Sequence, residues 1–164
     1  MSEAATGAED PEASRSADAP EAPEALLRQA MVDYPQDPAR GDFLIQYACT
    51  QAADPLPLYR VIYKFYNRQR RFGPAGDFAL RALHEAGRQG GLPARPEDWN
   101  VTALQALDID VASNALLALK ACSFIAFRRG DTQTGERWLA VLSALDPEDG
   151  SGVSVVSALA ESLA

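Results

Sequence analysis

One stretch, residues 59–73 with the sequence YRVIYKFYNRQRRFG, combines aromatic and basic residues at helical spacing. Tyr59, Tyr63 and Tyr66 recur every three or four residues and so share one face of a helix, with basic residues on an adjoining face. Tyr and Arg are enriched at the energetic centres of interfaces, because they offer contact area and forked hydrogen bonding to carboxylates. The sequence therefore predicts a protein-binding strip for an acidic partner. This basic–aromatic strip comprises Tyr59, Arg60, Tyr63, Lys64, Tyr66, Asn67, Arg68, Arg71 and Arg81.

Two alternative interpretations of the strip are open at this point. The tyrosines can pack inside the fold while the bases form a solvated face. The chain's own acidic start can also cover the bases, since residues 1–24 carry a net charge of −6 and residues 56–95 a net charge of +6. In that case, removal of residues 1–23 would strengthen binding to an acidic partner.

The residue types that catalysis and metal binding use are sparse. Cys49 and Cys122 lie 73 residues apart on expected apolar helix faces, and His84 is the single histidine. A structural zinc site needs about four ligands and a catalytic one about three, which this set reaches only if the fold brings all of it together. No nucleophile–base–acid arrangement or phosphate-binding loop is present. We expect no enzymatic activity, no metal and no cofactor, and keep a thiol- or metal-handling role as a minor alternative.

The overall composition is typical of one soluble globular domain, with 164 residues, 47% of them apolar and 23% charged. The net charge of −8 argues against nucleic acid or an anionic membrane surface as the main partner, because those partners attract clustered cations. Two distant cysteines favour a reducing, cytoplasmic location. The sequence has no uninterrupted apolar run of about 18 residues and no signal-peptide pattern, so we expect no membrane segment.

Residues 1–23 differ in composition from the rest of the chain. They are rich in Ala, Glu, Pro, Ser and Asp and contain no Leu, Ile, Val or aromatic residue. Such a segment buries too little apolar surface to offset an ordering cost of about 1–2 kcal/mol per residue. We therefore expect a disordered acidic tail over 1–23 and a folded domain over 24–164.

From residue 24 onward, apolar residues recur at helical spacing and Pro or Gly punctuates the pattern. No strand-like alternation occurs, so we expect an all-α fold. Residues 110–129 are apolar almost all round, which is typical of a helix in the middle of a bundle. The segment 90–98 has two glycines and two prolines and is expected to be irregular. The expected helices span 24–33, 40–53, 57–71, 74–89, 101–107, 110–129, 131–145 and 151–163.

Residues 116–149, LLALKACSFIAFRRGDTQTGERWLAVLSALDPED, resemble a tetratricopeptide repeat, which is a pair of antiparallel helices in 34 residues. Ser123 and Gly135 stand at its two small-residue positions. The turn matches at Gly130-Asp131 and the close at Asp146-Pro147. The match departs from the family at Cys122 and Ala126, where larger apolar residues are usual.

The rest of the chain fits the repeat more loosely. Residues 57–89 place Gly76 at the position of Gly135 but lack the Gly-Asp turn and the closing proline. Residues 25–53 read as the second helix of one repeat, a boundary near Pro35, and the first helix of the next. The resemblance implies about three helical hairpins whose first helices line a groove, where the basic–aromatic strip would receive an acidic segment.

The whole-chain layout, with LYRVIYKFYNRQRRF at 58–72 and a terminal repeat ending LDPEDGSG at 145–152, also resembles the small repeat-type accessory proteins encoded among bacterial nitrogen-fixation genes. This resemblance implies an assembly or protective partner of nitrogenase. We therefore expect a non-enzymatic accessory or assembly factor that recognises an acidic protein surface, such as that of a nitrogenase component. The alternative is a self-associating helical scaffold, in which the terminal helix 151–163 presents Val153, Val156 and Leu159 to another subunit.

Overall fold

The computed structural model describes residues 21–164, and every regular element within them is helical. The expected all-α fold is confirmed for this part of the chain. The expected tail, residues 1–23, lies outside the described residues except for its last three. The elements are α1 (Pro23–Asp33), α2 (Pro38–Gln51), α3 (Leu56–Arg68), α4 (Phe72–Gln89), the short 3-10 helix η1 (Pro96–Asp98), α5 (Val101–Gln105), α6 (Ile109–Arg128), α7 (Thr132–Leu145) and α8 (Val153–Ser162).

The helix ends follow from local sequence. Proline stands in the first turn of α1, α2 and α3, where its missing N–H costs nothing. The Asp37 carboxylate accepts from the Arg40 backbone N–H at 3.1 Å, and Asp131 accepts from that of Thr134 at 3.2 Å, which caps α2 and α7. The expectation that one helix runs to residue 71 is wrong, because Arg70 takes a left-handed φ of 58° and turns the chain after α3. Segment 90–98 is also not wholly irregular, since it contains η1.

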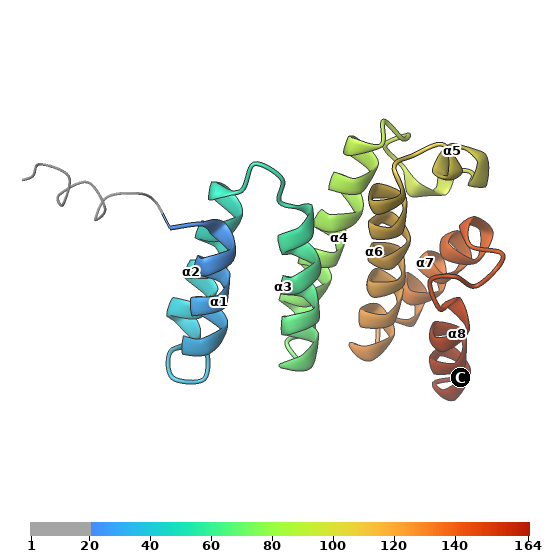
Figure 1. Ribbon diagram of the computed structural model, residues 1–164. Coiled ribbons are helices and arrows are strands. Elements are labelled where there is room, and N and C mark those ends of the chain that lie inside the picture. The colour runs from blue at the N-terminus through green and yellow to red at the C-terminus, as the bar shows by residue number, and fades with distance from the viewer. Residues whose placement is uncertain (1–20) are drawn as a thin grey trace, which may run out of the picture.

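The helices pack as antiparallel pairs that stand side by side in a row (Figure 1). Within the pairs α1 packs on α2, α3 on α4 and α6 on α7, while α4 packs extensively on α6. In Figure 1, α1, α3 and α6 run in one direction in front of α2, α4 and α7, and α8 follows at the C-terminal end against α6 and α7. The layers therefore place α3, α6 and α8 next to one another along the row.

The first pair differs from the expected repeat frame. We expected a repeat boundary near Pro35, but α1 and α2 pack extensively on each other and contact α3 only narrowly. Gly41 allows this close approach, because a Cβ there would lie 2.5 Å from the Tyr34 ring. Residues 25–53 thus form one hairpin and not the halves of two repeats.

The contact between α6 and α7 depends on two small residues. Buried Ser123 donates its hydroxyl to the Gly135 carbonyl oxygen at 2.7 Å, and a Cβ on Gly135 would lie 2.8 Å from the Phe127 ring. At Gly76, the position matched in sequence, a Cβ would meet Ile125 at an ordinary 3.7 Å. Small residues therefore bring α6 and α7 together, and Gly76 has no comparable role.

Among the described helices, α6 alone is long and apolar enough to cross a membrane by length and composition, with a mean hydropathy of 1.5 over its most apolar window. In this fold 39% of that window is buried, and the exposed residues of α6 are Ile109, Asp110, Ser113 and Arg128. The core helix of a soluble protein meets the same length and composition criterion. The position of α6 between α4 and α7 matches the expected helix in the middle of a bundle.

Candidate protein-binding site

The basic–aromatic strip divides between two sides of α3. The rings of Tyr63 and Tyr66 are buried, with 4% and 2% of their surfaces exposed, and Tyr59 is half-buried against Phe78 with a ring separation of 5.9 Å. The tyrosines therefore belong to the core, as the first of the two alternatives supposed. The basic residues form two groups. Those of the first group have hydrogen-bond partners within the protein, and those of the second have no ion-pair partner within residues 21–164.

Tyr66 and Arg71 belong to a cluster that joins the first hairpin to the second, and we call Tyr34, Asp42, Tyr66 and Arg71 the clasp. The Asp42 carboxylate accepts from Tyr66 Oη at 2.7 Å and from Arg71 Nη1 at 2.8 and 3.0 Å. Arg71 Nη1 also donates to the Tyr34 hydroxyl, and the guanidinium lies 5.5 Å from the centre of the Tyr66 ring. Arg71 therefore links α2 to the turn after α3.

The clasp shifts the titration of its members. Burial alone would raise the pKa of Asp42, but hydrogen bonds from Arg71 and Tyr66 outweigh it, so the pKa lies below its usual value. The pKa of Tyr66 is raised by burial and by the Asp42 carboxylate that its hydroxyl contacts. Near neutral pH the clasp therefore contains an ionised Asp42, a charged Arg71 and a neutral Tyr66 phenol.

Arg81 is also engaged inside the protein. Its Nη1 donates to Gln46 Oε1 at 3.1 Å, and its guanidinium lies 4.5 Å from the centre of the Phe78 ring. It therefore links α4 to α2. Arg71 and Arg81 do not lie with the remaining basic residues of the strip.

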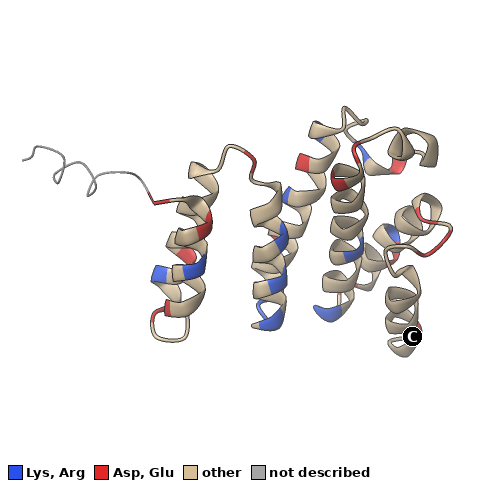
Figure 2. Cartoon of the chain, viewed as in Figure 1, with Lys and Arg blue, Asp and Glu red and all other residues tan. Residues whose placement is uncertain are grey.

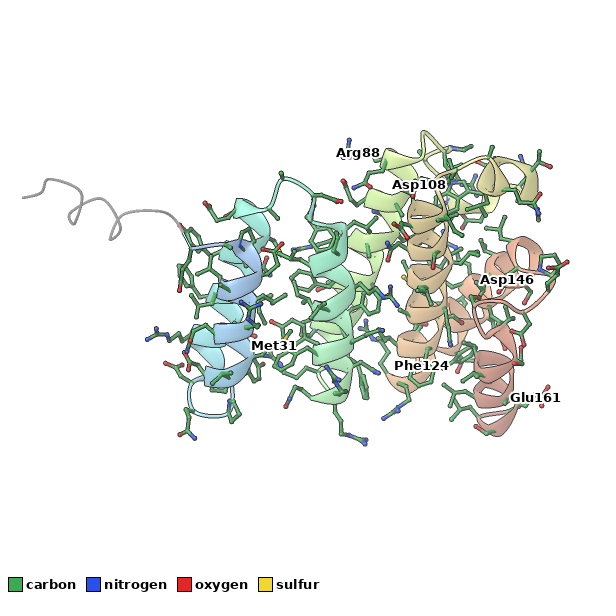
Figure 3. The ribbon with its side chains drawn as sticks, viewed as in Figure 1. Met31, Arg88, Asp108, Phe124, Asp146 and Glu161 are labelled. Carbon is green, nitrogen blue, oxygen red and sulfur yellow. The ribbon has the colours of Figure 1, made fainter. Side chains whose placement is uncertain are left out.

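Of those remaining residues, Lys64 lines a groove between α3, α6 and α8, with a volume of about 330 Å³, and Arg60 and Arg68 lie next to Lys64 on α3. Lys64 and Asn67 come from α3, Leu117 and Phe124 from α6, and Val155 from α8 (Figure 3 labels Phe124 on the lower half of α6). We call this surface the basic groove. Its lining residues are Tyr63, Lys64, Asn67, Leu117, Lys120, Ala121, Phe124, Ile125 and Val155.

Two cations line the basic groove, Lys64 on α3 and Lys120 on α6. Two more, Arg60 and Arg68, stand four residues before and after Lys64 on α3 and lie close enough to act on its charge. Figure 2 shows the basic residues along α3 and on α6, whereas α8 is almost uncharged. Within residues 21–164, none of these four side chains forms an ion pair within 4.0 Å. The chain's only two lysines both line this groove.

The cations affect one another. Burial lowers the pKa of Lys64, and the positive charges of Arg60, Arg68 and Lys120 lower it further. Lys120 leans toward the loop before α8, where a Cβ on Gly152 would lie 2.7 Å from its Nζ. An anion in the groove would relieve this mutual repulsion.

Asn67 adds an unsatisfied polar atom to the groove. Its Oδ1 is buried and has no hydrogen-bond partner within the described residues. A buried acceptor without a partner is uncommon in folded proteins, since the lost hydration is not compensated. Asn67 therefore lines the groove while its side-chain oxygen stays unsatisfied and out of reach of solvent.

The residues considered for thiol or metal chemistry have other surroundings. Cys49 is half-buried, and burial raises its pKa. Cys122 is buried, which raises its pKa to about 12 and disfavours the reactive thiolate. His84 is exposed beside Trp99 at a separate cavity of about 470 Å³. Over residues 21–164, no group of three His, Cys, Asp or Glu residues has the arrangement of a metal site.

Sequence reasoning missed Asp42, Lys120 and Val155. Asp42 escapes because its partners lie 24 and 29 residues away, and no local pattern marks such a pair. Lys120 and its apolar neighbours Leu117 and Phe124 carry a signal, since they share a second face of a helix already apolar on its first. That second face could have indicated a surface that is open to a partner.

No protein-family model, curated protein or solved structure was found to match this chain.

Proposed function

We propose that this protein is a non-enzymatic binding protein with tetratricopeptide-like hairpins, and that its basic groove receives an acidic part of another protein. The observation that carries the proposal is a set of four cations in or beside an open, largely apolar groove, none of which forms an ion pair within residues 21–164. Arg60, Lys64 and Arg68 repel one another at helical spacing, which costs a few tenths of a kcal/mol per pair. A carboxylate-rich partner neutralises this repulsion, and long-range electrostatic attraction raises the rate at which it associates.

The tetratricopeptide-like part of the proposal draws on the α6–α7 hairpin. Its Gly130 has a φ of 83° at the turn, and its small residues Ser123 and Gly135 meet across the pair. The packing of α4 on α6 continues the row from one hairpin to the next. In such an array the first helices of successive pairs, here α3 and α6, line the binding surface.

The accessory role rests on the second resemblance. A nitrogenase component is the first partner to test, because the resemblance to nitrogen-fixation accessory proteins names that enzyme. In the proposed role the chain binds this partner without performing its chemistry. The buried Cys122 and half-buried Cys49 favour binding over a thiol reaction.

Self-association is the second candidate function. The expectation that Val153 and Val156 face another subunit is wrong, because both are buried inside the protein. A different surface feature favours self-association. Phe43 and Tyr47 on α2 are 66% and 43% exposed and stack with their ring planes 3° apart. Exposed aromatic pairs of this kind are typical of interfaces. Light scattering of the purified protein distinguishes this scaffold from a monomeric adaptor.

The test of the main proposal is a double charge reversal, Lys64→Glu with Arg68→Glu, and the matched control is Arg95→Glu with Arg129→Glu. Arg95 and Arg129 are exposed and lie away from the basic groove. Tagged versions are purified from the host at low oxygen and moderate salt, and the bound proteins are identified by mass spectrometry. We expect a stoichiometric acidic partner with the wild type and the control, released as salt rises, and its loss with the groove variant. Equal recovery with both variants would contradict the proposal.

A further inference from the structure

We infer that the basic groove recognises an amphipathic acidic helix, with its apolar face on α6 and α8 and its carboxylates turned toward α3. This inference rests on the proposed function and names the kind of segment that the groove takes. Three features of the groove favour such a helix: its chemically unequal walls, the shape of its floor, and the helical backbone around it, whose peptide groups are already hydrogen-bonded.

The two walls of the groove differ in chemistry. The α3 wall carries Lys64, with Arg60 and Arg68 one helical turn to either side of it and close enough to lower its pKa. The α8 wall contributes Val155, an aliphatic side chain that is 54% exposed. An occupant must therefore present negative charge on one side and apolar surface on the other. An evenly acidic segment would leave the apolar wall in contact with carboxylates, which lose hydration there without gaining a partner.

The floor of the groove has the shape that receives a helix. Leu117, Ala121 and Phe124 follow one another at helical spacing on α6, with the small residue between the two large ones. This arrangement leaves a hollow above Ala121, bordered by larger side chains, into which one side chain of a partner helix fits. From residue 117 to residue 124 the floor is about 11 Å long at 1.5 Å per residue, which is two helical turns.

The backbone around the groove favours a helix over an extended segment. Its walls come from the interior of helices α3 and α6 and from α8, where the peptide groups bond within the helix. An extended occupant would find almost no backbone partners and would leave its own peptide groups unsatisfied against apolar side chains. A helix satisfies its own backbone hydrogen bonds, so it can dock on these side chains without losing any.

The spacing of the cations sets the spacing of the partner's acids. Arg60, Lys64 and Arg68 are four residues apart, so they are separated by about 6 Å along α3. Acidic residues at every fourth position of a helix lying along α3 have the same period. The groove thus favours a helix with acids at i and i+4, and with large apolar residues on the neighbouring face.

The chain's own start does not have this chemistry. Residues 1–20 are acidic but contain no Leu, Ile, Val or aromatic residue, so they offer nothing to the apolar wall. The tail sequence therefore serves as a natural control for binding by charge alone.

The test measures binding of labelled synthetic peptides to the full chain by fluorescence anisotropy. One 16-residue peptide has Leu and Glu placed as the groove requires, a second has the same residues in an order that scatters both faces, and a third has the sequence of residues 1–16. We expect the first peptide to bind at least tenfold more tightly than the other two and to gain helical circular dichroism on binding. No binding by the first peptide, or equal binding by all three, would overturn the inference.

A substitution in the protein tests the floor directly. Ala121→Leu fills the hollow, and Ala140→Leu makes the same change at an exposed position of α7 away from the groove. Leu is a good helix former, so both variants are expected to keep the fold, which their melting temperatures check. We expect Ala121→Leu to lower the affinity for the first peptide about tenfold and Ala140→Leu to leave that affinity unchanged. Equal affinities of the two variants would contradict a helix seated on α6.

The failures of the two proposals are distinguishable. If the three peptides bind equally and Lys64→Glu with Arg68→Glu abolishes all binding, acidic recognition holds and the helix inference is wrong. If Lys64→Glu with Arg68→Glu leaves both peptide and partner binding unchanged, the proposed function is wrong as well.

Discussion

The clasp and the basic groove use the same residue types in opposite ways. In the clasp, Arg71 is matched with the Asp42 carboxylate and two phenols, and its position is determined by the fold. In the groove, Lys64 has no acidic partner among residues 21–164, and burial together with the positive charges of its neighbours lowers its pKa. Charges that are satisfied internally stabilise the hairpin junction, whereas charges left without partners are available to another molecule. The sequence pattern of Tyr and Arg is the same for both.

The largest expected effect is on the clasp side. Tyr66→Ala removes a buried ring that contacts Tyr34, Phe65 and Phe78, and it leaves Asp42 without one donor. We expect a loss of about 3–5 kcal/mol in the free energy of unfolding, as for other large-to-small core changes. Urea unfolding followed by circular dichroism measures it. A loss below about 1 kcal/mol would show that Tyr66 is not part of a packed junction.

The next effect separates two arginines that are three residues apart in sequence. Arg71→Met breaks the ion pair and the hydrogen bonds to Asp42 and Tyr34, and we expect it to cost about 1–2 kcal/mol, since the pair is partly exposed. Arg68→Met on the groove side is expected to change stability by less than about 0.5 kcal/mol. Hydrogen exchange should speed up in α1 and α2 for the first variant only. Similar exchange in both variants would remove the distinction between clasp and groove.

Acid is expected to remove the clasp's contribution to the free energy of unfolding. Because the pKa of Asp42 is lower in the folded state, its carboxylate stabilises the fold above its unfolded pKa of about 3.9, and this stabilisation is lost as the pH falls through the lower folded value. The difference in unfolding free energy between wild type and Arg71→Met should therefore shrink as the pH falls from about 5 to about 2. Urea unfolding across this range measures it, and a difference that stays constant would argue against an ionised Asp42 in the clasp.

The smallest expected effect has the opposite sign in stability and in binding. Lys64→Gln removes one member of the repelling set, so we expect a gain of about 0.2–0.5 kcal/mol at low salt, which fades at high salt. The same change should weaken the binding of the acidic partner. Denaturation at two salt concentrations measures the change in stability, and a binding titration measures the change in affinity. A loss of stability would mean that Lys64 makes a favourable contact within the protein.

Much of the fold could be predicted from the sequence, because helix signals are local. Proline, Asp caps and apolar spacing placed the helix ends within about three residues, and the apolar character of 110–129 indicated the central helix. The pairing of α1 with α2 was not predicted, since it depends on Tyr34 lying over Gly41 and on the clasp. Neither feature leaves a pattern in a single sequence.

The candidate site was predicted only in part. Spacing placed Tyr59, Tyr63 and Tyr66 on one face of a helix, but it could not determine whether that face meets solvent or the core. The burial of Tyr63 and Tyr66 follows from the packing of α4 and α6 on α3, and such tertiary contacts leave no local pattern in the sequence. Which arginines are free depends likewise on Asp42 and Gln46, which come from a different hairpin.

The most direct test uses the chain's two lysines, which both line the groove. Reductive methylation with ¹³C keeps their positive charge and gives each one a separate signal in an NMR spectrum. When the acidic partner is added, we predict that both signals shift, that the pKa of Lys64 rises from its lowered value, and that salt reverses both changes. Tight binding of that partner with neither lysine signal moved would contradict the claim that the unpaired cations of the groove are the binding site.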